Sequence, residues 1–188
     1  MSRVSQTRAL RISEACVEQF FERGTTRVNI DELAAAAEVS RRTFHRYFES
    51  KEASIRPVLA HGMTLMAAHL SEADPEIELA DAVVAALAHA VDGRYRRRTS
   101  HLIPLLDETD GMRAVFFQAI SDGAHALTEP IAARLGVPTA SAEARVNAEI
   151  VATIVRLALL DSYGRNTDPV ETFRDYLDRA GILRPVPV

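Results

Sequence analysis

"NIDELAAAAEVSRRTFHRYF", residues 29–48, reads as two short helices joined by a tight turn. Asn29 stands three residues before Glu32, which is the spacing of a capping box and predicts a helix that begins directly after Asn29. Ser40 is a second cap candidate and predicts another helix that ends near Phe48. Two short helices around a tight turn form a helix-turn-helix, in which the second helix enters the major groove of DNA.

The second of these helices is predicted to have an apolar side and a cationic side. At 100° per residue, Phe44 and Phe48 fall on one side, where they can pack against Leu33. Arg42 and Arg46 point the opposite way. Arginine suits bidentate contact with guanine, a threonine methyl group can touch the methyl group of thymine, and tyrosine or lysine can donate to phosphates. The candidate DNA contacts on these grounds are Arg42, Thr43, Arg46, Tyr47 and Lys51, with Arg41 and His45 on the flanks.

Charge is distributed unevenly along the 188 residues, whose formal net charge is −4. The segment that ends at Arg56 holds ten basic and eight acidic residues, whereas the remainder holds twelve basic and eighteen acidic residues. The net acidity therefore does not exclude a polyanionic partner, because binding depends on the local surface.

Residues that begin and end helices, such as capping side chains, glycine and proline, recur along the whole chain. No segment alternates apolar and polar residues long enough to predict a strand. Pro57 is expected either to kink a long helix that starts near Ser50 or to mark the end of its first stretch, and Asp74 is expected to cap the next helix. The fold is therefore predicted to be all-α, with about nine helices. These cover approximately residues 5–23, 30–37, 41–48, 51–70, 76–91, 102–106, 110–135, 140–163 and 168–180.

The sequence contains no apolar run long enough to span a membrane and no signal peptide, so a cytoplasmic protein is expected. Cys16 is the single cysteine and cannot form an internal disulfide. We find no nucleophile elbow, phosphate-binding glycine loop or acid–base pair of carboxylates, and no two histidines four residues apart on one helix. An enzyme, a bound cofactor and a metal site are therefore not expected.

The second part of the chain is predicted to form a helical bundle with a ligand pocket between its helices. Its lining would be mainly aliphatic and would favour a lipophilic or acyl-like ligand. The basic run "RYRRR", residues 94–98, could accept a ligand phosphate such as that of a coenzyme A thioester, reach toward DNA, or be a solvated helix start. The pocket candidates are Met63, Met66, Leu87, Leu102, Leu105, Phe116, Phe117, Ile120 and Ile154, although most apolar residues in this region should be plain core.

The segment "AEIVATIVRLALLDSYG", residues 148–164, has apolar residues on more than one face, which is more than a surface helix of a monomer needs. The last two long helices are predicted to pair with their copies in a second chain, in a four-helix dimer interface that would bury these residues. Two recognition helices would then lie about 34–36 Å apart and read successive major grooves of a palindromic site. The interface candidates are Ile150, Val151, Val155, Ala158 and Leu159.

The segment "CVEQFFERGTTRVNIDELAAAAEVSRRTFHRYFESKEAS", residues 16–54, resembles the N-terminal domain of the TetR family of bacterial transcriptional regulators. The resemblance implies a DNA-binding domain of three helices over residues 1–50 and a ligand-binding and dimerisation domain over 51–188. It also implies a homodimer that usually represses its target genes. By position, it implies DNA contacts at Arg41, Arg42, Thr43, His45, Arg46, Tyr47 and Lys51, with Asn29 and Asp31 near the DNA backbone.

The chain departs from the family pattern in the turn of the helix-turn-helix, where Glu38 stands in place of the usual glycine. A left-handed residue there would cost on the order of 1 kcal/mol. Two alternatives to a ligand-responsive regulator are also considered. One is a ligand-binding or protein-interaction module that keeps the helix-turn-helix only as a scaffold, and the other is an activator or architectural DNA binder without an effector.

Overall fold

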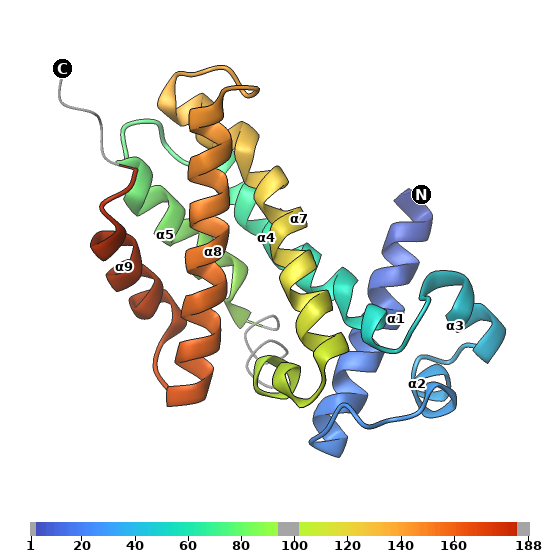
Figure 1. Ribbon diagram of the computed structural model, residues 1–188. Coiled ribbons are helices and arrows are strands. Elements are labelled where there is room, and N and C mark those ends of the chain that lie inside the picture. Colours follow the sequence, from blue (N-terminus) through green and yellow to red (C-terminus); the bar gives the residue numbers. More distant parts are fainter. Residues whose placement is uncertain (1–2, 94–101, 184–188) are drawn as a thin grey trace. The chain divides into compact units, whose positions relative to one another are not determined.

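The computed structural model describes residues 3–93 and 102–183. Every regular element in these ranges is a helix, which confirms the predicted all-α fold (Figure 1). The α-helices are α1 (Arg3–Arg23), α2 (Ile30–Ala36), α3 (Arg41–Tyr47), α4 (Arg56–Glu72), α5 (Leu79–Ala90), α7 (Asp110–Leu135), α8 (Ala142–Arg165) and α9 (Pro169–Ala180). Two 3-10 helices, η1 (Glu52–Ile55) and η2 (Ile103–Glu108), complete the set. The basic run 94–98 lies outside the described residues.

The chain divides into two compact units. The first comprises Met1–His61 and Arg96–Ala119, and the second comprises Gly62–Tyr95 and Ile120–Val188. Helices α4 and α7 each begin in the first unit and end in the second. The first unit therefore contains the helix-turn-helix together with a segment that follows it by more than forty residues in the sequence. The domain boundary after residue 50 stays a prediction.

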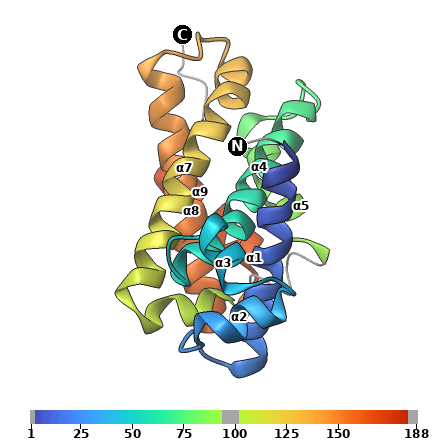
Figure 2. The same ribbon diagram turned by 90° about the vertical axis from the view of Figure 1, so that its right-hand side faces the viewer.

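The first unit is built on α1, whose apolar stripe is buried against α2 and η1. Cys16 and Phe20 are fully buried in this stripe, as the spacing of four residues requires. The buried Ser13 hydroxyl accepts the Val58 N–H at 3.2 Å, which fastens α1 to the first turn of α4. Figure 2 turns this unit so that α2 and α3 face the viewer.

The second unit packs α9 along α8 and α5 (Figure 1). Asp168 caps α9 by accepting the N–H groups of Val170 and Glu171, and the buried Phe173 and Leu177 mark the inward face of the helix. Helices α4 and α7 approach closely where Gly123 meets Met63, because a Cβ at Gly123 would lie 2.4 Å from the Met63 Cγ. Glycine is therefore required at that crossing.

Two predicted helix starts differ from those in the structure. Residues 52–55 form a 3-10 turn, so α4 begins at Arg56 and places Pro57 in its first turn, where a missing N–H costs nothing. Pro57 thus lies where the 3-10 stretch gives way to α4, which agrees with the expected end of a first stretch and not with a kink inside a continuous helix. Asp74 accepts the Glu76 N–H at 3.0 Å within a turn, and α5 begins only at Leu79. The Asp74 side chain therefore caps a local turn and does not cap the start of α5.

The predicted apolar helix near residues 102–106 is the 3-10 helix η2. No helix in the described ranges is both long and apolar enough to cross a membrane.

Candidate nucleic-acid interface

Helices α2 and α3 are held by side-chain caps of the predicted kind. The Asn29 side chain accepts the Glu32 N–H at 2.9 Å, and the Glu32 carboxylate accepts the Asn29 N–H at 3.2 Å, so the capping box is complete. The Ser40 hydroxyl accepts the Thr43 N–H at 3.1 Å and starts α3. These bonds satisfy backbone donors that would otherwise lack a partner at the helix starts. The two helix starts are therefore confirmed.

The turn between the two helices contains Glu38 in the left-handed region, with φ of 54°. Its N–H donates to the Ala35 carbonyl at 3.0 Å, and the Val39 N–H donates to the Ala34 carbonyl at 2.9 Å. These two bonds close the turn and force the left-handed conformation. Because Glu38 has a Cβ atom, the turn carries a steric cost that glycine would avoid.

Helix α3 buries Phe44 and exposes its cationic side chains. Phe44 packs edge to face on Phe48, with ring centroids 5.3 Å apart, and both rings are buried. The side chains of Arg41, Arg42, His45 and Arg46 are exposed, whereas Thr43 and Tyr47 are half-buried. The structure therefore presents the predicted cations together on one solvent-facing surface.

The cations of α3 differ in their local partners. Arg41 pairs with Asp31 of α2 at 3.0 Å, and the Arg46 guanidinium lies 5.3 Å from the centre of the Tyr47 ring. Arg42 has no ion-pair partner in the described part of the chain. Arg42 is thus a guanidinium donor without an ion-pair partner among the described residues, and Arg41 is held against the preceding helix.

Lys51 lies off this surface. Its ammonium group donates to the carbonyl oxygens of Thr26 at 3.0 Å and Val28 at 3.4 Å. Both acceptors belong to the loop that joins α1 to α2. In this structure the side chain therefore ties that loop to η1, and it would have to leave these acceptors to reach a DNA phosphate.

The same loop is held from its other side by Glu108, the last residue of η2. One carboxylate oxygen of Glu108 accepts the Thr25 hydroxyl at 2.9 Å, the Thr26 N–H at 2.7 Å and the Thr26 hydroxyl at 2.7 Å. We name Glu108, Thr25, Thr26 and Lys51 the Thr26 clamp. Glu108 was not among the predicted site residues, because a single glutamate more than eighty residues from the loop carries no sequence pattern that links the two.

The hydrogen bonds of the clamp also lower the pKa of the Glu108 carboxyl. Burial by itself would raise the pKa of the Glu108 carboxyl. The bonds from the Thr26 hydroxyl and N–H, together with the bond from Thr25 and the nearby charge of Arg27, outweigh burial and hold that pKa below its ordinary value. The carboxylate is therefore charged at neutral pH.

A hollow lined by basic residues lies beside the α2–α3 turn, and its arginines were not among the predicted site residues. Exposed Arg8 and Arg11 of α1 line it together with Glu38, and its volume is about 600 Å³. Its lining also includes the apolar residues Ile12 and Val39. A scan for cations on the second helix of the motif could not find these arginines, because they belong to α1.

The predicted ligand-pocket residues are mostly buried. Met63, Met66, Leu87, Leu102, Phe116, Ile120 and Ile154 are buried, Leu105 is half-buried and Phe117 is half exposed. They fall into both compact units, since Leu102, Leu105, Phe116 and Phe117 belong to the first and the others to the second. A separate open hollow of about 600 Å³ in the second unit is lined instead by His125 and Thr128 of α7, Thr139, and Arg145 and Ile150 of α8, among others.

The predicted dimer residues lie mostly inside the single chain. Val151, Val155, Ala158 and Leu159 are buried within the chain, and Ile150 is half-buried. The apolar surface that remains on α8 is a stripe at Val146, Ile150 and Leu157, which we name the α8 stripe. Val146 is 54% and Leu157 is 40% exposed. Whole-helix hydrophobicity could not separate the inward face from the outward face of this helix.

The remaining reactive groups do not form a site. Cys16 is completely buried, and burial raises the pKa of its thiol to about 11, although a hydrogen bond with Ser54 acts in the opposite direction. Within residues 3–93 and 102–183, no three histidine, cysteine or acidic side chains are grouped to hold a metal ion.

Comparison with known proteins places the helix-turn-helix in a family. The family model described as "Bacterial regulatory proteins, tetR family" matches residues 12–53. A relative is the MftR regulator of Mycobacterium tuberculosis, whose name links it to mycofactocin biosynthesis; it is 36% identical over 89 residues. That alignment covers 46% of this chain and 45% of MftR, so it spans less than half the length of either protein.

Solved structures match over nearly the whole chain. The TetR-family repressor FadR of Thermus thermophilus, solved in complex with lauroyl-CoA, has a TM-score of 0.59 at 25% identity; the match covers 96% of this chain and 98% of FadR. NalD of Pseudomonas aeruginosa is the secondary repressor of the MexAB-OprM multidrug efflux pump. It has a TM-score of 0.57 at 21% identity, and the match covers 95% of this chain and 95% of NalD. The NalD match shows the common fold.

Proposed function

Because the chain belongs to the TetR family of bacterial DNA-binding regulators, we propose that it is a ligand-responsive repressor that binds a palindromic operator as a homodimer. The observation that carries this proposal is the surface of α3, where Arg42, His45 and Arg46 are exposed around the buried Phe44. A helix with this division can enter the major groove while its apolar side stays in the domain.

The contacts proposed for DNA divide into two kinds. Arg42 and Arg46 are proposed to read base edges, because a guanidinium can bond O6 and N7 of guanine together. Arg41, Thr43, His45 and Tyr47 are proposed to contact the backbone or flanking bases, and Asn29 to lie near a phosphate. The Asn29 side chain already caps α2, and the Lys51 ammonium already bonds the Thr26 carbonyl. We therefore propose that these two residues act mainly by holding the helices in place.

The homodimer is proposed to form through the α8 stripe. Val146, Ile150 and Leu157, together with exposed Thr153, recur at intervals of four, three and four residues, which is the spacing that aligns side chains along one seam between helices. An exposed apolar seam of this kind favours burial against another helix. The outward face of α9, in contrast, carries charged residues such as Glu171, Arg174 and Asp178.

The effector is proposed to be lipophilic or acyl-like. In support, FadR, which shares 25% identity with this chain over most of its length, was solved with lauroyl-CoA. In the second unit of this chain, Met63, Met66, Leu87, Ile120 and Ile154 provide an aliphatic interior. A ligand that prefers one of two conformations 100-fold can shift operator binding by up to about 2.7 kcal/mol.

The test of sequence-specific binding is selection from random DNA duplexes, followed by sequencing, at one near-physiological salt concentration. We expect the wild-type chain to enrich a palindromic motif, and Arg42→Ala to lose or relax one position in each half-site. The matched control is Arg179→Ala, at an exposed arginine of α9. Uniform, salt-sensitive binding without a motif would support the scaffold alternative.

The effector proposal is tested separately with acyl-CoA thioesters of increasing chain length. Binding should raise the melting temperature of the chain and release the selected operator. A rise in melting temperature with no change in operator affinity would contradict coupling between ligand and DNA.

A further inference from the structure

In the Thr26 clamp, a carboxylate and an ammonium group bind the same residue, Thr26, from opposite sides of its peptide. The N–H and hydroxyl of Thr26 donate to the Glu108 carboxylate at 2.7 Å each, and the carbonyl of Thr26 accepts from the Lys51 ammonium at 3.0 Å. Thr26 is completely buried. Hydrogen bonds to charged partners are stronger than neutral ones, and a buried donor left without its partner is costly.

The segment held by the clamp leads directly into the DNA-binding motif. Val28, whose carbonyl also accepts from Lys51, is followed by Asn29, the cap of α2. Helix α2 packs on α3. A change in the position of Thr26 is therefore passed through two residues to the start of α2, and from there to the helix that carries Arg42.

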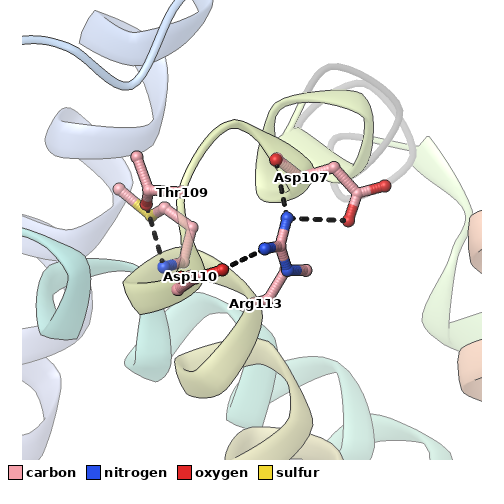
Figure 3. Close-up of polar contacts among 5 residues, drawn as sticks. Asp107, Thr109, Asp110 and Arg113 are labelled. Atoms are coloured by element: carbon pink, nitrogen blue, oxygen red, sulfur yellow. Dashed lines mark hydrogen bonds and ion pairs between the residues drawn. The ribbon is translucent and has the colours of Figure 1, made fainter.

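The neighbours of Glu108 are held in place between the end of η2 and the start of α7. Arg113 donates to the Asp107 carbonyl at 2.8 Å and pairs with Asp110, and the Thr109 hydroxyl accepts the Met112 N–H at 3.2 Å (Figure 3). These contacts fix the residues on both sides of Glu108. Helix α7 then continues from the first compact unit into the second.

Close packing holds the same helix start against η1. A Cβ at Gly111 would lie 3.0 Å from the Glu52 Cγ, so α7 approaches η1 closely at this point. Glu52 follows Lys51 in the chain. Both charged members of the clamp are thus attached to elements that touch each other within the first unit.

We infer that Glu108 is a positioning residue for DNA recognition, which sets the place of α2 and α3 through Thr26 and thereby connects the start of α7 to the DNA-binding surface. This inference rests on the proposed DNA-binding function. Helix α4 is joined to the helix-turn-helix because it follows α3 and η1 directly in the chain. The contact of Glu108 with Thr26 gives α7 a second, non-covalent connection to the same motif.

The test compares Glu108→Gln with Asp107→Asn in the full-length chain. Both variants remove one negative charge from adjacent residues. The exposed Asp107 carboxylate lies 3.9 Å from Arg113 and contacts no member of the clamp, and Asp107→Asn leaves the Asp107 carbonyl that accepts from Arg113 in place. For Glu108→Gln we expect the affinity for the selected operator to fall about tenfold at fixed salt, which corresponds to the loss of one charged hydrogen bond. Asp107→Asn should change affinity less than about threefold. Equal effects in the two variants would overturn the inference.

A second measurement does not depend on DNA. In hydrogen–deuterium exchange, Glu108→Gln should exchange faster than wild type in residues 25–36, with no change in α8. If exchange in residues 25–36 were unaltered, the inference would fail even for a folded variant. If wild-type protein enriched no DNA motif but the exchange difference were present, the proposed function would fail, while the mechanical link from Glu108 to α2 would stand.

The Thr26 hydroxyl supplies an internal check. Thr26→Val removes one donor to Glu108 and keeps the N–H, so it should weaken operator binding in the wild-type background. In the Glu108→Gln background the same change should have a smaller effect, because the partner of the hydroxyl has already been altered. Additive effects of the two substitutions would contradict a shared clamp.

Discussion

Glu38 occupies a position of the turn where the family resemblance implies glycine. Its φ of 54° lies in the left-handed region, so the steric cost considered for this position applies. The backbone bonds of the turn impose that conformation on whichever residue occupies the site. Of the residues other than glycine, asparagine tolerates it best.

Replacing Glu38 by glycine should therefore stabilise the protein. Removal of the Cβ relieves about 1–2 kcal/mol, and the greater freedom of glycine in the unfolded chain offsets about 0.5–1 kcal/mol. The midpoints give a net gain of about 0.75 kcal/mol, and the extremes give about 0 and about 1.5 kcal/mol. Glu38→Ala keeps the Cβ and should match wild type within about 0.5 kcal/mol. Urea denaturation measures both, and a gain with alanine as large as that with glycine would show that the carboxylate, not the backbone, is the cause.

Cys16 should behave as an inert apolar side chain. With a pKa raised to about 11, only on the order of one thiol in a thousand is ionised at pH 8, and the thiolate is the form that reacts. Iodoacetamide at pH 8 should therefore leave the native protein unlabelled in mass spectrometry and label it fully in denaturant. Rapid labelling of the native protein would mean that α1 opens far more often than its packing indicates.

At the scale of elements, the sequence predicts helices best where caps and stops are local. The capping box at Asn29, the Ser40 cap and the start of α9 at Asp168 all follow from contacts within four residues, and all are confirmed. Asp74 carries the same local signal but serves a turn, which Arg134 of α7 secures by donating to its carbonyl at 2.7 Å. Such a distant partner cannot be read from neighbouring residues.

The candidate site divides in the same way. The exposed cations of α3 were predictable because helical periodicity separates them from Phe44. Glu108, Arg8 and Arg11 were not, since only the packing of distant segments brings them to the motif. Lys51 was predicted as a phosphate donor, but its position facing two carbonyl oxygens depends on where the α1–α2 loop folds.

The Ser40 cap offers a test confined to α3. Ser40→Ala removes the acceptor of the Thr43 N–H and should cost about 1 kcal/mol of stability, whereas Ser40→Thr should retain most of it. Because Arg41 and Arg42 lie in the first turn, operator binding should weaken with the alanine variant more than with the threonine variant. Denaturation and DNA titration on the same samples test this, and equal operator binding by the two variants would show that the cap does not order the reading side chains.

For the whole molecule, the arrangement of apolar surface on α8 decides how two copies could pair. The buried side of α8 serves the chain itself, and the α8 stripe is exposed apolar surface that a partner can cover. The apolar residues of α8 are thus divided between an internal face and an external one.

Leu157→Asp should therefore shift the protein from dimer to monomer at micromolar concentration, because a carboxylate buried in an apolar seam without a partner is strongly unfavourable. Sedimentation velocity provides the measurement. Ala180→Asp, at an exposed position of α9, is the control and should leave the sedimentation coefficient unchanged. A dimer that survives Leu157→Asp would exclude the α8 stripe as the interface.

The discontinuous first unit affects how the chain can be recombined with its relatives. A chimaera that joined residues 1–61 to the effector half of another regulator would keep Thr25, Thr26 and Lys51 but would leave Glu108 behind. The graft would then present two threonines to whatever residue the new host supplies at the start of its own α7. Transplanting the DNA specificity of this protein therefore requires two inserts, residues 1–61 and 102–119, which must be exchanged together.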